Sequence, residues 1–266
     1  MGDLGARVLS VMATSPVALS IEGPRADIRL ERPDVLNAMD FDVFDGLAAA
    51  ADALHPRDDI RVVVVSGAGR SFSSGIDLSA IGAIGGSSEE TVARAQAGFR
   101  KIAALPMPTV ASIQGHAYGA GLQLALACDL RVVAADAKMG LLEARYGLIP
   151  DLCGSNRLPN LIGAGRAKKM IWLAETVDGT AAAAIGLAEV VVAADELTKA
   201  TDELADRLIA APATPVREAK ALVEGARLRS LEEGMDAEAA AQLRCMSDRE
   251  FAEILMAGLQ KKAARG

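Results

Sequence analysis

The chain of 266 residues is 51% hydrophobic but only 3% aromatic, and its 28 basic and 35 acidic residues leave a net charge of −7. A hydrophobic fraction this far above that of disordered chains predicts a sizeable core. The negative charge and the scarcity of aromatic rings argue against nucleic acid as a partner. A small anionic ligand stays compatible with the composition, because a few local Arg and Lys side chains can hold it.

The number of cysteines and the composition of the N-terminal segment indicate the cellular compartment in which the protein works. Cys128, Cys153 and Cys245 are scattered, and no pair has metal-ligand spacing. A sparse, odd count is typical of a reducing environment without a disulfide framework. The segment from Met1 to Ser15 has no apolar run long enough for a signal peptide, and no later run has membrane-spanning length. We therefore expect a cytoplasmic protein with no membrane partner.

Hydrophobic periodicity predicts alternating strands and helices up to about residue 195. The expected elements, in chain order, are strands over 16–22 and 26–31, a helix capped by Asp40 and running to Leu54, a strand over 61–66, a helix over 88–105, a strand over 109–113, a short helix over 122–127 and a strand over 130–134. Strand, glycine-rich loop and helix recur, which is typical of stacked ββα or βαβ units in an α/β protein.

The chain changes character after about Glu196. Strand patterns vanish there, and Ala, Glu, Leu and Arg recur at helical spacing. This pattern predicts several helices packed on the core or on another subunit. We divide the chain into a core over 1–195 and a helical oligomerisation region over 196–266.

Two glycine-rich loops each follow an apolar strand, one at 74–78 and one at 115–121. Glycine lets the backbone approach a ligand closely, and N–H groups at a loop-to-helix junction can stabilise a developing anion. Either loop alone is more simply a tight turn. Two such loops from neighbouring strands could, however, direct two donors at one oxygen. Neither loop completes a phosphate-binding fingerprint.

Two carboxylates lie in apolar surroundings, where a raised pKa suits a group that transfers protons near neutral pH. Glu143 follows Gly140-Leu141-Leu142, and Asp151 follows Ile149-Pro150. An ordinary surface acid is the alternative, which the residues favour for Asp151 and leave open for Glu143. The two histidines, His55 and His116, are too distant in sequence for a zinc motif, and no G-x-S-x-G nucleophile elbow occurs.

Three segments together resemble the signatures of the enoyl-CoA hydratase/isomerase (crotonase) family: 66–78, 109–129 and 143–154. Their shared order over roughly residues 17–195 makes the resemblance specific. It implies a crotonase-like spiral of stacked ββα units with a helical C-terminal region, usually assembled as a homotrimer or a dimer of trimers. It also implies an acyl-CoA thioester as substrate, with CoA as part of that substrate and with no metal or other cofactor.

The same resemblance implies roles for individual residues. The backbone N–H groups of Ile76 and Ala120 match the family's donors to the thioester oxygen. The further residues that it implies as contacts to the substrate are Ser74, Gly75, Asp77, Leu78, Gly119 and Gln123. Glu143 matches the second catalytic glutamate of the family's hydratases, whereas the first falls on Gln123, which has no titratable proton. Asp151 stands where dienoyl-CoA isomerases carry an aspartate.

We therefore predict an enoyl-CoA isomerase. Glu143 would take the C2 proton, and either Glu143 or Asp151 would return a proton further along the acyl chain. The alternative within the family is a hydratase with an incomplete pair of glutamates. Alternatives from other classes are a catalytically weak acyl-CoA-binding protein and a thioester hydrolase that uses Cys128 or Cys153.

Overall fold

The computed structural model describes residues 16–77, 79 and 88–263. Its first element is a β-hairpin. β1 (Val17–Glu22) pairs antiparallel with β2 (Arg25–Leu30). Gly23 turns the chain between them at a φ of +55°, a conformation that glycine adopts at little cost. The predicted pair of strands is confirmed to within one residue at each end.

The larger sheet has the strand order β1-β2-β3-β4-β6-β9. Its remaining members are β3 (Val62–Gly67), β4 (Thr109–Ile113), β6 (Leu130–Ala134) and β9 (Val190–Val192). Every neighbouring pair from β2 to β9 is parallel. The apolar runs of β3 and β4 are buried on both faces, as in parallel sheets that helices cover. The strands predicted over 61–66, 109–113 and 130–134 are confirmed.

A smaller sheet contains β5 (His116–Tyr118), β7 (Lys138–Gly140) and β8 (Thr176–Asp178). Successive units give one strand to each sheet and then a helix: β4, β5 and α4 (Ala120–Ala127), followed by β6, β7 and α5 (Gly154–Ile162). This repeat confirms the expected spiral of ββα units. The segment 115–121, which we expected to be a loop, contains β5, a strand too short to show alternation.

Helices cover the larger sheet. α1 (Phe41–Leu54) packs against β1, β2 and α3 (Glu89–Ala103), and α8 (Leu197–Ala210) packs against β3, β4, β6 and β9. The Asp40 carboxylate accepts the N–H of Val43 at 3.0 Å, which confirms it as the cap of α1. Two further helices, α6 (Ala164–Leu173) and α7 (Gly179–Ala184), pack against α5 and β8 respectively.

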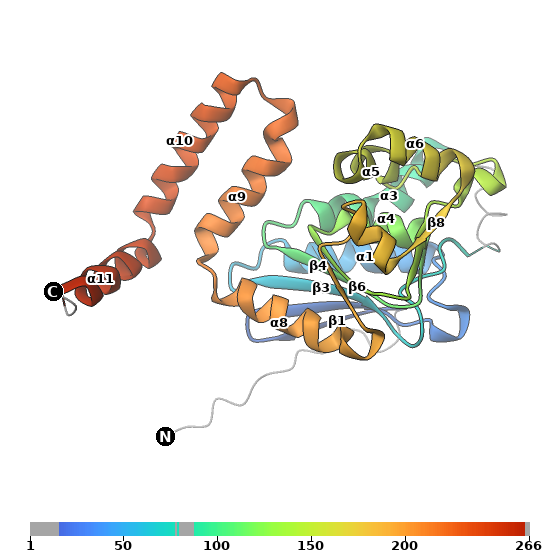
Figure 1. Cartoon of the computed structure of the whole chain (residues 1–266), viewed down its shortest axis with the longest axis horizontal. Helices are drawn as coiled ribbons and strands as arrows, with labels where there is room; N and C mark the ends of the chain where they lie inside the picture. The colour runs from blue at the N-terminus through green and yellow to red at the C-terminus, as the bar shows by residue number, and fades with distance from the viewer. Residues whose placement is uncertain (1–15, 78, 80–87, 264–266) are drawn as a thin grey trace.

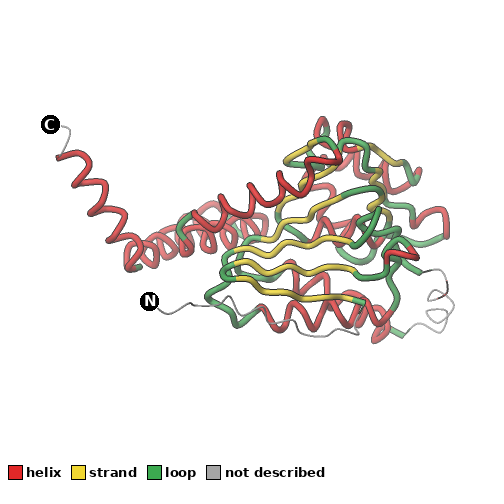
Figure 2. The backbone as a smooth tube through the Cα atoms, turned by 90° about the horizontal axis from the view of Figure 1, so that it is seen from below, coloured by secondary structure: helices red, strands yellow, loops and turns green. Residues whose placement is uncertain are grey.

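The last three helices extend from this core as an arm, defined here as α9 (Ala213–Gly225), α10 (Leu231–Ser247) and α11 (Arg249–Ala263) (Figures 1 and 2). They confirm that the chain is helical after Glu196, whereas its division into parts between residues 195 and 196 stays a prediction. Within the described residues, no helix has the combination of length and apolar character that crossing a membrane requires.

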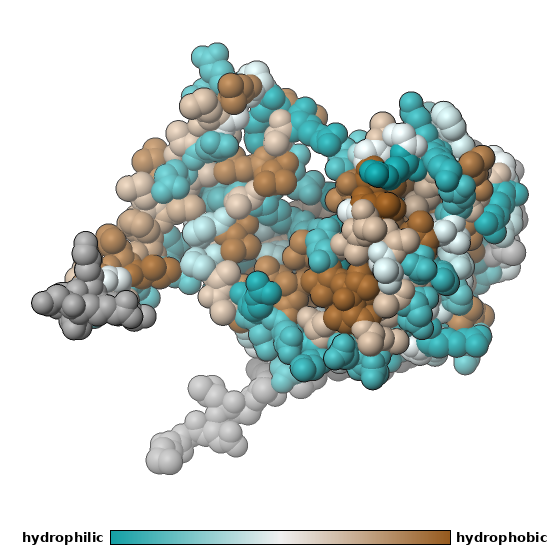
Figure 3. All heavy atoms as spheres, viewed as in Figure 1, coloured by the Kyte–Doolittle hydropathy of each residue, from teal (hydrophilic) through white to brown (hydrophobic). Residues whose placement is uncertain are grey.

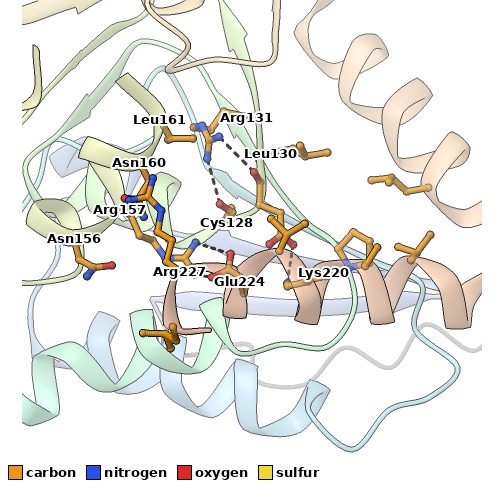
Figure 4. A pocket seen from close by; sticks show the side chains of 17 residues that line it. Cys128, Leu130, Arg131, Asn156, Arg157, Asn160, Leu161, Lys220, Glu224 and Arg227 are labelled. Atoms are coloured by element: carbon orange, nitrogen blue, oxygen red, sulfur yellow. Dashed lines mark hydrogen bonds and ion pairs between the residues drawn. The ribbon is translucent and has the colours of Figure 1, made fainter. Parts of the chain in front are cut away.

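Ion pairs link the arm to the core across a cleft of about 850 Å³ (Figure 4). Lys220 of α9 lies 2.7 Å from Asp129, and Arg157 of α5 lies 2.9 Å from Glu224. None of the residues of α9 is fully buried, although the helix takes part in these ion pairs. Ion pairs therefore tie the arm to the core, and many of its large apolar side chains are exposed.

Candidate active site

The two glycine-rich segments lie side by side. An isolated parallel bridge joins Ser73 to Ala117, with the Tyr118 N–H donating to the Ser73 carbonyl at 3.0 Å. A Cβ on Gly75 would lie 2.9 Å from the Tyr118 carbonyl oxygen, and one on Gly121 would lie 2.7 Å from the Ser73 carbonyl oxygen. Because both distances are shorter than real Cβ contacts, the close approach of the segments depends on glycine at both positions.

Two backbone donors beside this contact have no partner among the described residues. Met39 forms a parallel bridge with Ile76 by donating to the Gly75 carbonyl and accepting from the Asp77 N–H, each at 2.8 Å. The N–H of Ile76 takes no part in this bridge. Neither it nor the N–H of Ala120, in the first turn of α4, donates to any group in the described part of the chain. Both donors are thus available to a ligand oxygen.

These donors border a cavity of about 410 Å³. Its lining comprises Val35, Ala38, Ser74, Gly75, Ile76, Asp77, Tyr118, Gly119, Ala120, Leu142, Glu143, Tyr146 and Leu148. Ser74, Gly75, Asp77 and Gly119, which the sequence singled out as substrate contacts, therefore share one cavity with the two free donors. Leu78 lies outside the described residues. Polar donors in a largely apolar cavity are the usual composition of a small-molecule site.

Glu143 enters this cavity from a short 3₁₀ helix (Glu143–Tyr146) that follows β7. Its side chain is buried, and its Oε1 atom accepts a hydrogen bond of 2.7 Å from Gln123 Nε2. Its Oε2 atom is also buried but has no hydrogen-bond partner among the described residues. Burial raises the pKa of Glu143, whereas its own backbone N–H and the bond from Gln123 act in the opposite direction; the negative charge of Asp151 makes the smallest contribution and also raises the pKa.

Gln123 contacts Glu143 from α4 but does not line the cavity. It is fully buried, and its Oε1 atom accepts the backbone N–H groups of Leu152 at 2.7 Å and Gly154 at 2.9 Å. Both functional ends of its amide are therefore engaged.

Asp151 lies near Glu143 without lining the cavity. Its residue is half-buried, burial raises the pKa of its carboxyl group, and Gln96 of α3 donates to its backbone carbonyl at 2.7 Å. The fold thus brings both predicted acids into one neighbourhood, although only Glu143 reaches the cavity that holds the two donors.

Asp77 is tied to its surroundings rather than free to react. The hydroxyl and N–H of Ser79 and the guanidinium of Arg32 donate to its carboxylate, which lowers the pKa of Asp77. Arg32 also donates to the carbonyl of Ala38, a residue of the cavity lining. Sequence reasoning had not singled out Arg32, since an arginine next to a proline is not a recognisable signal by itself.

Neither cysteine that we considered as a nucleophile has the properties of one. Burial raises the pKa of Cys128 and of Cys153 to about 12, so their reactive thiolate forms are scarce at neutral pH. Neither lines the cavity of Glu143. Within residues 16–77, 79 and 88–263, no three His, Cys, Asp or Glu side chains are grouped so that they could hold a metal ion.

Comparison with known proteins places this chain in a family. The family model described as enoyl-CoA hydratase/isomerase matches residues 22–264. The chain is 30% identical to a crotonyl-CoA hydratase of Syntrophomonas wolfei, over 95% of this chain and 98% of that protein. It thus extends over nearly the whole length of that relative.

Solved structures agree in fold. An enoyl-CoA hydratase of Bacillus anthracis has a TM-score of 0.85 at 30% identity, with 92% of this chain and 96% of that chain covered. A Thermobifida fusca protein described as an enoyl-CoA hydratase, solved in complex with acetoacetyl-CoA, has a TM-score of 0.84 at 35% identity, with 88% and 96% covered. The chain belongs to the enoyl-CoA hydratase/isomerase (crotonase) family.

Proposed function

We propose that this protein adds water across the double bond of a 2-enoyl-CoA thioester and catalyses the reverse dehydration. The observation that carries this proposal is a buried carboxylate, Glu143, on the same cavity as the N–H groups of Ile76 and Ala120, which donate to no group in the described part of the chain. The relatives support water addition over the double-bond shift that the sequence suggested first, because those compared above are described as hydratases. The acetoacetyl-CoA bound by the Thermobifida fusca relative supports a thioester as the ligand.

The N–H groups of Ile76 and Ala120 would hold the thioester oxygen. Negative charge develops on that oxygen when C2 gains carbanion character, and donors already fixed in place stabilise the resulting enolate without reorganising. The position of Ala120 in the first turn of α4 adds the positive end of the helix dipole. Ser74, Gly75, Asp77 and Gly119 would form the surrounding wall.

One carboxylate is sufficient for water addition. The ionised Glu143 accepts a proton from water while the water oxygen bonds to C3, and the electrons of the double bond move toward the thioester to give the enolate. Glu143 then returns the proton to C2. The two hydrogens of water end on the C3 hydroxyl group and on C2, and Glu143 is ionised again. Its raised pKa makes the carboxylate a stronger base in the first step, in which it accepts the proton of water.

A double-bond shift is the second candidate, favoured by one observation. Gln123, which donates a hydrogen bond to Glu143, has no titratable proton. Asp151 is an acid close enough for its negative charge to raise the pKa of Glu143. Glu143 alone could move a proton from C2 to C4, and Glu143 with Asp151 could serve the longer shift in a 3,5-dienoyl-CoA.

A panel of substrates distinguishes the candidates. We expect a 2-enoyl-CoA to be converted to the 3-hydroxyacyl-CoA, measured as loss of the enoyl absorbance and confirmed by mass spectrometry. Migration of the double bond in 3-enoyl- or 3,5-dienoyl-CoA without hydration would overturn the proposal in favour of an isomerase. Release of free CoA would indicate a thioester hydrolase, and binding without conversion of any substrate would indicate an acyl-CoA-binding protein.

We also propose that the protein assembles as a trimer or as a dimer of trimers. Figure 3 shows hydrophobic surface on the arm as well as on the core. The exposed large apolar side chains of the arm and the loops within it are Val223, Leu228, Leu231, Met235, Leu243, Met246, Phe251, Ile254, Leu255, Met256 and Leu259. So much exposed apolar surface on a thin projection marks a protein contact.

This assembly is testable in solution. Because burial of the arm against another copy removes apolar surface from water, we expect association at micromolar concentration. Sedimentation equilibrium should give a mass of three or six chains of 27.5 kDa. A monomer at that concentration would contradict the proposal.

A further inference from the structure

The amide of Gln123 is held from two sides. On one side its Oε1 atom accepts the N–H groups of Leu152 and Gly154, and on the other its Nε2 atom donates to Glu143 Oε1 at 2.7 Å. Two backbone N–H groups can face an oxygen but not an NH₂ group, so this network determines which way the amide points. Rotating the amide would set donor against donor and place two oxygens 2.7 Å apart.

The two N–H groups converge because the turn that carries them has an unusual backbone. Cys153 lies between them in the left-handed region, with a φ of 92° and a ψ of −9°. Few residues other than glycine adopt this conformation, which costs roughly 1–3 kcal/mol and is maintained only by its surroundings. The Cys153 Sγ atom also donates to the Gln123 backbone carbonyl at 3.3 Å. The turn therefore contacts the backbone of Gln123 as well as its side chain.

Gly154 permits the close approach of this turn. A Cβ at that position would lie 2.9 Å from Gln123 Oε1 and 3.0 Å from its Cγ atom. A side chain there would push the turn and the amide apart. The contact of 2.9 Å between the Gly154 nitrogen and Gln123 Oε1 therefore depends on the absence of a Cβ at position 154.

The held amide makes the two oxygens of Glu143 unequal. Oε1 has a permanent donor, whereas Oε2 is buried and has no partner among the described residues. A buried carboxylate oxygen without a donor is rare, because its desolvation is not compensated. Because Oε1 already accepts a hydrogen bond from Gln123, Oε2 is the more basic of the two oxygens and the one on which we expect a transferred proton to reside.

We propose that the turn from Leu152 to Gly154 is a positioning device for the reaction: it fixes the Gln123 amide as a donor to Glu143 Oε1, so that Oε2 alone carries the transferred proton. Leu152, Cys153 and Gly154 act through Gln123 and touch no reacting atom. The inference rests on the proposed function for its use of Glu143, but the hydrogen-bond arrangement itself is measurable without substrate.

Glutamine and glutamate at position 123 would therefore affect Glu143 differently. A glutamate would satisfy the N–H groups of Leu152 and Gly154 equally well, since an ionised oxygen also accepts both. Its second oxygen, however, would face Glu143 Oε1 at the distance that Nε2 now occupies. Two carboxylates so close cannot both ionise and must share a proton.

The titration of Glu143 tests the device. We propose carbon-13 NMR of ligand-free protein labelled at the glutamate carboxyl carbons, with Glu143→Gln identifying the signal. Loss of the donated bond removes an interaction that favours the charged form, so Gly154→Ala and Cys153→Val should each raise the pKa of Glu143 by about one pH unit. Asp151, whose negative charge also raises the pKa of Glu143, is unchanged in both variants.

Two comparisons separate positioning from general damage. Cys153→Gly retains the left-handed turn and should leave the pKa of Glu143 at its wild-type position. Gly165→Ala is the matched control for Gly154→Ala, because nothing lies within 4 Å of a Cβ at Gly165. Gln123→Glu should raise the pKa without any change in the turn, which keeps the test valid if a turn variant does not fold.

The pH dependence of kcat/KM provides a second measurement. Ionised Glu143 begins the proposed reaction, so activity falls as the pH drops through its pKa, and this acidic limb should move to higher pH with the NMR midpoint. If Glu143 kept its wild-type pKa in both Gly154→Ala and Cys153→Val, or in Gln123→Glu, the proposed positioning role of the turn would be overturned. Absence of turnover with every enoyl-CoA would overturn the proposed function alone, since the titration requires no substrate.

Discussion

Replacement of Glu143 with glutamine should lower kcat by about 10²–10⁴-fold, the usual contribution of a general acid–base group. Glutamine keeps the size of the side chain, and its amide oxygen can still accept the hydrogen bond from Gln123 Nε2. The cavity and the donors of Ile76 and Ala120 are unaffected, so binding of the CoA thioester should persist. Steady-state kinetics give kcat, and calorimetry gives the dissociation constant.

An exposed acid provides the control for this substitution. Glu196 lies on the surface before α8 and outside the cavity, so Glu196→Gln should keep wild-type turnover. Near-full activity in Glu143→Gln would remove Glu143 from the mechanism. A loss of binding in step with activity would instead indicate that Glu143 holds the substrate rather than transferring a proton.

Replacement of Gly75 with alanine should lower kcat by about 10²–10³-fold, the effect of losing one donor to a developing oxyanion. Gly75 has a φ of +103°, and its Cβ would lie 2.9 Å from the Tyr118 carbonyl oxygen and 3.8 Å from the Ala120 nitrogen. The new methyl group must push the two glycine-rich segments apart. The N–H groups of Ile76 and Ala120 would then no longer converge on one oxygen.

The matched control is Gly23→Ala. Gly23 also has a positive φ, of +55°, but nothing lies within 4 Å of its Cβ position, and it belongs to the turn between β1 and β2. Both variants bear a similar conformational cost, so both should lower the melting temperature. Only Gly75→Ala should lose turnover beyond its loss of folded protein. Equal activity in the two variants would exclude the backbone donors as the stabilising group.

Much of the fold was predictable because it follows from local patterns. The valine run of β3 and the apolar runs of β4 and β6 have the composition of strands buried on both faces, and Asp40 is a typical helix cap. β5 was missed because three residues between glycines contain less than two periods of alternation. Its pairing with β7 depends on residues 22 positions away, as the register of His116 with Lys138 shows.

The candidate site was predictable in part. Glu143, Ile76 and Ala120 were identified through a resemblance of whole segments, and the fold places all three on one cavity. The engagement of Gln123 was not predictable, because it depends on a left-handed backbone at Cys153, a residue type that gives no sign of that conformation. The free Oε2 atom of Glu143 likewise follows only from three-dimensional contacts.

A crystal structure of Glu143→Gln with crotonyl-CoA would show where the thioester binds, because the slowed variant should retain the substrate. We expect the thioester oxygen at about 2.7–3.1 Å from the backbone nitrogens of both Ile76 and Ala120. We also expect C2 and C3 to face the side chain at position 143. A thioester bound in the cleft beside α9, or in the cavity with its oxygen turned away from both nitrogens, would contradict the account.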